Sequence, residues 1–401
     1  MNILFLDAYF YPEITAFTHL ENDIIKDLIS EGHSIFVICP TPSRGLSKEI
    51  YCKYKKIKDE VFYDGKLVVK RFWAPREKKS VIKRFMRYIY CNLKTYNLAK
   101  KIKNIDMVFS NSTPPTQGFL ASKIAKKKKC DFVFSVQDIF PDSLVYSGIA
   151  SKKSFMYKIG KKILKKTYVN TTKIVVIDEY FKNSIKVIYD TNNIETISNW
   201  IDTDNVKPVD IKYNSLYDEL KIPRNKFLVV YAGNMGESQN TNIILDIANE
   251  VYNSDKDILF VIFGGGSKFD EFKINASKYN NILVNPLLPQ ERVPEVYSLG
   301  DVAMITCKKG VGRSGLPSKT WSILACETPI LACFDLDSPL GNLIVNNNLG
   351  EIVDPNDIES AVKKILYMKN NKKKYITREY VLKNASKEIC CKKYCNLLTK
   401  K

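Results

Sequence analysis

Short runs of β-branched and aromatic residues alternate along the chain with longer stretches in which apolar residues recur at helical spacing. In the first half the short runs lie at 2–8, 34–39, 67–73, 107–110, 132–136, 173–177 and 195–198. In the second half they lie at 227–232, 257–263, 281–284, 302–306, 329–332 and 350–353. Strands that alternate with helices in this way are typical of parallel sheets covered by helices. The pattern predicts an α/β protein with two successive Rossmann-like domains.

The stretch 198–224 separates the two series, because it is rich in turn residues, contains two prolines and lacks apolar periodicity. We therefore expect a first domain at 1–198, a second at 199–375, and a C-terminal helix at 376–401 that packs back toward the first domain. A helix at 17–31 is expected to end at Gly32, a residue suited to the left-handed backbone that follows helices. Ligands of open parallel sheets bind outside the carboxyl ends of the strands, so we expect the two sheets to face each other across a ligand-binding cleft.

Length and composition agree with this organisation and argue against several classes of protein. The 401 residues suit two domains. Asp7 interrupts the first apolar run, and no run reaches the length of about 18 residues that a membrane span needs, so a cytosolic protein is expected. Ten cysteines without metal-type spacing indicate free thiols. Only two histidines are present, so neither a histidine metal site nor a Ser-His-Asp relay is expected.

The first candidate for ligand binding is the turn at Gly233, Asn234 and Gly236, which directly follows the run at 227–232. Glycines let backbone N–H groups approach an anion closely, and a helix is expected within a few residues. An ordinary tight turn between strand and helix explains the same residues equally well. The three glycines at 264–266 are open to the same two interpretations.

The segment 310–328 carries the densest set of candidates. It is punctuated by glycines, follows a predicted strand and includes the cations Arg313 and Lys319. A helix that begins at Pro317 or Ser318 would direct backbone N–H groups toward a diphosphate, and the two cations would neutralise its charge. Preorganised donors of this kind also stabilise a departing phosphate. The alternative is a solvated basic loop before a core helix.

Two acidic motifs also follow predicted strands. Asp138 comes after the run at 132–136, where it could contact a ligand hydroxyl or accept a proton. It could equally cap the next helix together with Pro141 and Asp142. Asp335 and Asp337 are spaced like a metal-binding pair of carboxylates but are expected in a surface turn, so no metal site is predicted.

The net charge of +19 is concentrated in the first half, where residues 1–195 hold 35 Lys and Arg against 19 Asp and Glu. Two amphipathic stretches at 81–104 and 151–166 combine lysines and arginines with apolar residues at helical spacing. Such helices can lie on an anionic membrane surface, although their apolar faces could also belong to the core. Nucleic acid is the rival partner of a basic patch. No nucleic-acid-binding module accompanies these helices, so no nucleic acid is expected.

Several motifs together resemble glycosyltransferase family 4, a retaining family with the GT-B double-Rossmann fold. The segment YFYPEITAFTHLENDIIKDLISEGHSIFVICP at 9–40 is similar to the first βαβ unit of that family. YAGNMGESQNTNIILDIA is similar to the start of the family's second domain. NILVNPLLPQERVPEVYSLGDVAMI is similar to the family's base-binding loop and the helix after it, and GLPSKTWSILACETPILA to its signature helix. The forms QDIFPDS, SNWID and LPSK resemble the branch that transfers N-acetylated amino sugars in O-antigen and capsule synthesis.

The resemblance implies a nucleotide-sugar donor, UDP-linked in our interpretation, and an acceptor sugar carried on polyprenyl diphosphate. It also implies retention at the anomeric carbon and no metal or other cofactor. Together with the basic amphipathic stretches, a lipid-linked acceptor predicts an enzyme that is cytoplasmic and peripheral at the inner face of the cell membrane. The residues expected at the donor are Gly233, Asn234, Gly236, Leu287, Arg313, Ser314, Gly315, Leu316, Pro317, Ser318, Lys319 and Ser322. Asp138 is the candidate catalytic residue, and Thr15 and Ala16 form the first-domain cleft loop.

The chain departs from the family pattern at two places. The family has two Glu eight positions apart in its signature, where this chain has Ser314 and Ser322. The paired glycines of the first loop are replaced by Thr15 and Ala16. Two other functions therefore stay open, a GT-B nucleotide-sugar epimerase and a non-catalytic subunit that binds sugar nucleotides.

Overall fold

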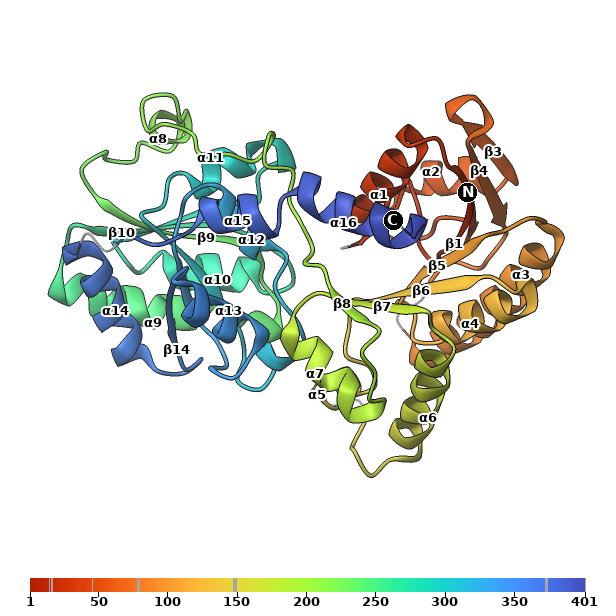
Figure 1. Cartoon of the computed structure of the whole chain (residues 1–401). Helices are drawn as coiled ribbons and strands as arrows, with labels where there is room; N and C mark the ends of the chain where they lie inside the picture. Colours follow the sequence, from red (N-terminus) through yellow and green to blue (C-terminus); the bar gives the residue numbers. More distant parts are fainter. Residues whose placement is uncertain are drawn as a thin grey trace. The chain divides into compact units, whose positions relative to one another are not determined.

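The computed structural model describes residues 1–13, 15, 17–44, 46–77, 80–146, 150–371 and 374–400, without the side chains of Val81, Ile82, Tyr146 and Ser314. The chain divides into two compact units. The first comprises Met1–Asn199 together with Glu388–Lys401, and the second comprises Trp200–Lys387. Each unit is a layered α/β structure (Figure 1).

The first unit is built on an eight-stranded sheet with the order β3-β4-β2-β1-β5-β6-β7-β8. Its strands are β1 (Asn2–Leu6), β2 (Ser34–Pro40), β3 (Asp59–Phe62), β4 (Leu67–Phe72), β5 (Met107–Asn111), β6 (Asp131–Val136), β7 (Lys173–Val176) and β8 (Ile194–Thr196). All neighbouring strands are parallel except β3 and β4, which are antiparallel. The helices are α1 (Thr18–Ser30), α2 (Lys48–Tyr54), α3 (Val81–Lys101), α4 (Gln117–Lys128), α5 (Asp142–Tyr146), α6 (Phe155–Val169), α7 (Glu179–Ile188) and α16 (Lys387–Thr399).

The second unit is built on a six-stranded parallel sheet with the order β11-β10-β9-β12-β13-β14. Its strands are β9 (Phe227–Asn234), β10 (Ile258–Gly265), β11 (Ile282–Pro286), β12 (Val302–Thr306), β13 (Ile330–Cys333) and β14 (Gly350–Val353). The helices are α8 (Leu216–Glu219), α9 (Ile243–Ser254), α10 (Phe269–Ala276), α11 (Val293–Tyr297), α12 (Lys319–Ala325), α13 (Pro339–Asn347), α14 (Ile358–Asn370) and α15 (Arg378–Asn384).

Side chains of β9 show why its run is apolar throughout. Val230 and Ala232 pack into one buried cluster of the second unit, whereas Val229 and Tyr231 pack into another. Successive side chains of a strand point to opposite faces of the sheet. Both faces of this sheet are therefore covered, which is typical of parallel sheets and explains the absence of polar alternation.

The C-terminal helix α16 belongs to the first unit. Its Tyr394 is buried, and the hydroxyl lies 3.0 Å from Ser135 Oγ of β6. The ring of Tyr394 also meets Phe109 of β5 edge-on, with the ring centroids 6.2 Å apart. Figure 1 shows α16 beside α1. The last turns of the chain therefore complete the core around the middle of the first sheet.

The structure confirms the predicted fold of two parallel-sheet α/β units. Every predicted strand run overlaps an observed strand, and α1 ends close to Gly32, whose φ is +90°. The antiparallel strand β3 was not predicted, because its sequence DEVF is exposed and carries no apolar pattern. Among the described residues, no helix is long and apolar enough to cross a membrane.

Candidate active site

The loops at the carboxyl ends of β9, β10, β11 and β12 are joined by backbone hydrogen bonds. Met235 N donates to Gly265 O at 2.6 Å, and Leu287 N donates to Gly264 O at 2.9 Å. Lys308 N donates to Ser238 O at 2.9 Å, which connects the loop after β12 to the loop after β9. Chain segments distant in sequence therefore meet at the sheet edge where open α/β proteins bind ligands.

Lys319 and Gly233 form the centre of this edge. The Lys319 ammonium lies 4.3 Å from the centroid of the Tyr231 ring, and a Cβ placed on Gly233 would lie 2.5 Å from Lys319 Nζ. Gly233 also has a φ of +151°, which residues with side chains rarely adopt. Glycine is therefore required at position 233 both for the backbone and for the space that the lysine occupies.

The environment of Lys319 is low in polarity. Burial lowers the pKa of its ammonium to about 8, so that it is still largely protonated at pH 7. The Tyr231 ring beneath it is held by a hydrogen bond from the tyrosine hydroxyl to Asn234 O at 2.9 Å. The residue as a whole remains partly exposed. A ligand can therefore reach a cation that water solvates poorly, where an anion is attracted more strongly than at an open surface.

Asn234 and Gly236 are tied to one side chain that the sequence did not single out. Gln239 Oε1 accepts hydrogen bonds from Asn234 Nδ2 at 3.1 Å and from Gly236 N at 3.0 Å. Thr306 Oγ1 donates to Gln239 O at 2.6 Å. The glycine turn is thus a fixed structure linked to β12.

Asp335 and Asp337 shape the loop after β12. Asp335 is buried, contrary to the expected surface turn, because its carboxylate accepts hydrogen bonds from Gly310 N at 2.8 Å and Gly312 N at 2.9 Å. Asp337 accepts from Arg313 Nε at 2.9 Å. These acids hold the loop and its cation. Within the described part of the chain, no group of three or more His, Cys, Asp and Glu is arranged to hold a metal ion.

The rest of the signature segment surrounds the start of α12. Gly315 is extended, and space around it is open, whereas Leu316 packs against the core of the unit. Pro317 O accepts a hydrogen bond from Thr320 N at 3.0 Å, and Ser318 directly precedes the helix. Ser322 lies on α12 one turn after Lys319 and hence on the same side of the helix. The side chain of Ser314 is outside the described part of the chain.

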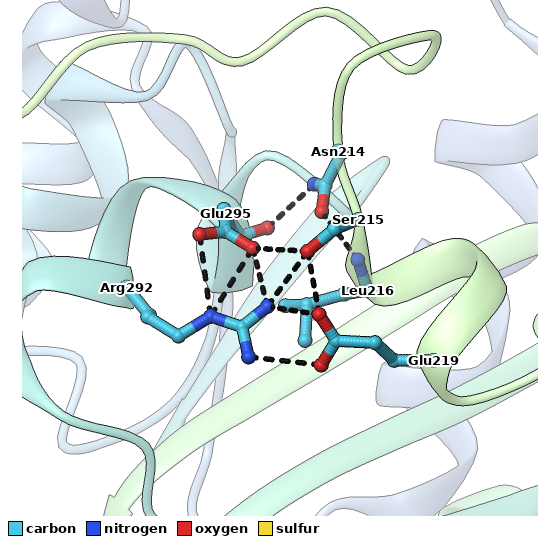
Figure 2. A network of polar contacts seen from close by, with 6 residues as sticks. All are labelled: Asn214, Ser215, Leu216, Glu219, Arg292 and Glu295. Carbon is cyan, nitrogen blue, oxygen red and sulfur yellow. Dashed lines mark hydrogen bonds and ion pairs between the residues drawn. The ribbon is translucent and has the colours of Figure 1, made fainter.

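Leu287 begins the loop after β11 and is 48% exposed. A network of polar contacts fixes the end of this loop (Figure 2). Arg292 Nη2 donates to Ser215 Oγ and to Glu219 Oε1, both at 2.9 Å, and also pairs with Glu295. The loop is thus bound at one end to β10 and at the other to both ends of the short helix α8.

In the first unit, Asp138 follows β6 and is partly buried. Burial raises the pKa of its carboxyl, and hydrogen bonds from Ser143 and from the backbone of Ile139 oppose this shift. The contact with the side chain of Ser143 links Asp138 to the first turn of α5 and leaves both alternatives open. Thr15 Oγ1 lies 2.5 Å from Thr18 Oγ1 at the start of α1, and Ala16 lies outside the described residues.

Each half of the chain matches the model of a known protein family. Residues 22–205 match the family model described as Glycosyltransferase Family 4, and residues 214–388 match the model described as Glycosyl transferases group 1. The two halves of the chain are glycosyltransferase domains. Their order along the chain is that of the two observed units.

Relatives of this glycosyltransferase have been named in two bacteria. It is 23% identical to WcaI of Escherichia coli (strain K12), named as a candidate glycosyl transferase of colanic acid biosynthesis, over 99% of each chain. It is 25% identical to WbjE of Pseudomonas aeruginosa, named as a probable glycosyltransferase, over 71% of this chain and 72% of the other. The crystal structure of Anabaena Alr3699/HepE in complex with UDP superposes with a TM-score of 0.73 at 12% identity, covering all of both chains. That likeness shows the GT-B fold.

A buried acidic pair in the family 4 domain was missed from the sequence. Asp7 follows β1 and Glu21 lies in the first turn of α1, and both are almost fully buried. Asn111 Nδ2, at the end of β5, donates to Asp7 Oδ1 at 3.4 Å. Burial raises the pKa of both carboxyls, and the neighbouring Asp7 carboxyl raises the pKa of Glu21 further. The pair lies at the carboxyl edge of the first sheet, beside the loop that contains Thr15.

Proposed function

We propose that this protein is a retaining glycosyltransferase that moves a sugar from a nucleoside diphosphate to a saccharide carried on polyprenyl diphosphate. The product would be part of a bacterial surface polysaccharide such as an O-antigen or a capsule, and the sugar an N-acetylated amino sugar. The observation that carries this proposal is the desolvated Lys319 ammonium, held against Gly233 and Tyr231 at the carboxyl edge of a glycosyltransferase domain. HepE in its complex with UDP and WcaI in colanic acid biosynthesis support the donor and the pathway class.

Lys319 would bind the donor diphosphate. When the bond between sugar and diphosphate breaks, negative charge grows on the leaving phosphate, and a fixed cation in a poorly solvated site stabilises that charge. The exposed side chain of Leu287 would contact the base, and Ser322 would contact the ribose from the same side of α12 as Lys319. Arg313, held by Asp337, would add a second and more exposed positive charge. No metal is required in this proposal.

Asp138 and the loop containing Thr15 would belong to the acceptor side. The carboxyl of Asp138 could contact a sugar hydroxyl while its hydrogen bond with Ser143 keeps it in place. Since a retaining transfer depends strongly on the positions of donor and acceptor, correct placement would supply a large part of the rate.

Product analysis tests this function. The purified protein would be incubated with UDP-, GDP- and dTDP-linked N-acetylated amino sugars and a polyprenyl-diphosphate-linked monosaccharide, and the products identified by mass spectrometry. We expect an acceptor lengthened by one sugar and release of UDP. Conversion of the donor to an epimer without transfer would establish the epimerase instead. Donor binding without any product would establish the non-catalytic subunit.

We also propose that α3 and α6 dock the protein on an anionic membrane, where a polyprenyl-linked acceptor is found. The sequence left open whether their apolar residues are core, and the structure places several of them at the surface. Phe85, Met86 and Leu93 of α3 are 55%, 60% and 61% exposed, and Phe155 of α6 is 79% exposed. Lysines and arginines flank these residues, and each cation near an anionic surface contributes about 1 kcal/mol.

Replacing Phe85 and Leu93 together by glutamine is expected to weaken binding to phosphatidylglycerol-containing vesicles about tenfold or more, because two large apolar side chains no longer enter the interface. Sedimentation with vesicles measures the bound fraction. The matched control replaces Ile274 and Val345 of the second unit by glutamine, since both are as exposed as the α3 residues. Equal binding by the two double variants and the unchanged protein would rule out docking through α3.

A further inference from the structure

A second candidate binding site lies in the first unit, away from the residues proposed to bind the acceptor. It is a pocket of about 420 Å³ at the C-terminal ends of α3 and α4, two helices that lie side by side in Figure 1. The residues that line it are Tyr96, Lys100, Ile102, Lys103, Asn104, Ile105, Ile124, Lys127 and Lys128. α3 ends shortly before β5 begins and α4 ends shortly before β6 begins. The pocket is therefore at the amino edge of the first sheet, the opposite edge from Asp7 and Asp138.

Four lysines gather around this pocket. Lys100 Nζ and Lys127 Nζ lie 4.3 Å and 5.7 Å from the centroid of the same Tyr96 ring. Lys128 Nζ donates a hydrogen bond to Ile102 O. Burial and the nearby charge of Lys127 lower the pKa of Lys128. The fold thus holds several ammonium groups close together, although their mutual repulsion and their partial burial are unfavourable in free energy.

Charges of the described residues offset only part of this cluster. The C-terminus of a helix carries about half a negative charge, so α3 and α4 together offset about one of the four positive charges. Asp131 is ion-paired with Lys400. Asp106 Oδ2 accepts a hydrogen bond from the neutral Asn2 N at 2.7 Å, so its charge can offset one more. An excess of about two positive charges therefore surrounds the pocket.

We propose that this pocket binds a phosphate ester. The lysines supply charge-assisted hydrogen bonds to the phosphate oxygens, for which an ammonium group is well suited. The pocket is many times larger than one phosphate needs, and Ile102, Ile105 and Ile124 give it an apolar wall. These features fit a phosphate that carries a body of about the size of a sugar or a glycerol. The ester can come from a soluble sugar phosphate or from the headgroup of an anionic phospholipid.

The test separates this pocket from the donor site and separates the two sources. All proteins carry Lys319→Ala, so that phosphate binding at the proposed donor site does not contribute. The pocket variant adds Lys100→Gln and Lys127→Gln. The matched control adds Lys101→Gln and Lys126→Gln, which remove the same charge from the last turns of the same two helices but do not line the pocket. Glucose 1-phosphate binding is measured by calorimetry, and binding to phosphatidylglycerol vesicles by sedimentation.

We expect the pocket variant to bind at least one probe about tenfold more weakly or worse, while the control binds as its parent does. Loss of glucose 1-phosphate binding identifies a soluble ligand. Loss confined to vesicle binding identifies a phospholipid headgroup. Equal loss in both variants, or no loss in either, overturns the proposal. Because the parent lacks Lys319, none of these outcomes depends on whether the proposed transferase function is correct.

Discussion

Replacing Lys319 by alanine is expected to lower kcat for sugar transfer about 100- to 1000-fold, the effect usual for removing one preorganised donor from a developing oxyanion. The fold should tolerate this change. A lysine whose pKa is lowered by burial is less stable as a cation in the folded protein than in the unfolded chain. Removing it relieves that cost at neutral pH, so the thermal midpoint should stay the same or rise.

The control for this substitution is Lys363→Ala, which removes an exposed lysine from α14 in the same domain. Initial rates with a UDP-sugar, UDP affinity by calorimetry and thermal unfolding would be measured for both variants. Wild-type transfer rates in Lys319→Ala would show that the diphosphate assignment is wrong. Loss of rate together with a large drop in thermal midpoint would point to a structural role for the lysine.

The pH dependence of activity provides a second test of the role of Lys319. Because burial lowers the pKa of Lys319 to about 8, the cation is lost as the pH rises through that value. The kcat/KM for the donor should therefore fall above pH 8. Lys319→Arg keeps the charge at all these pH values, so its remaining activity should not show the fall.

The fold was predictable from the sequence because most strands of a parallel sheet are buried on both faces, and such strands have a recognisable sequence pattern. Strands covered on both faces, such as β9, appear as uninterrupted apolar runs. Among the strands of the described residues, β3 was missed, because it is an exposed edge strand whose four residues show no such run. Periodicity also could not decide whether the apolar residues of α3 are core or surface. That depends on what packs against the helix, and the structure exposes Phe85 and Leu93.

The candidate site was predictable only in part. Gly233 and Lys319 could each be named from local motifs, but their contact joins residues far apart in the chain and has no sequence signal. Asp335 was misjudged because its partners are backbone N–H groups of another loop. Glu21, in contrast, left a signal that could have been used. It falls on the same face of α1 as Ile24, Ile25 and Leu28, where a charged residue is out of place.

Glu21 is the residue for which we expect the second large effect. Glu21→Gln should change the pH dependence of the free energy of unfolding. Burial raises the pKa of Asp7 from 3.8 to about 7 and raises that of Glu21 well above 4.5, so the folded state holds more protons than the unfolded chain between about pH 4 and 7. Stability contributed by the protonated pair is complete in acid and is lost as the pH rises through this window. Each unit of raised pKa costs about 1.4 kcal/mol once the carboxyl must ionise.

Glutamine has the shape of glutamic acid but no charge, and its amide can donate a hydrogen bond to the Asp7 carboxylate. Glu21→Gln should therefore be more stable than the unchanged protein by about 1–3 kcal/mol at pH 8, and this advantage should shrink toward zero near pH 4. The other titratable groups that face the pair do not interfere. Burial raises the pKa of Cys39 to about 12 and raises that of Tyr394 as well, so neither ionises in this range.

Denaturant unfolding from pH 4 to pH 8 measures the effect, with Glu49→Gln as the control because Glu49 is an exposed acid in the same unit. The control should follow the unchanged protein at every pH. A constant difference between Glu21→Gln and the unchanged protein across the range would mean that the pKa of Glu21 is not raised in the folded protein. Lower stability of Glu21→Gln at pH 8 would mean that the charge of Glu21 is stabilised by the fold. In either case Asp7 and Glu21 would have to be described as an ordinary ionised pair.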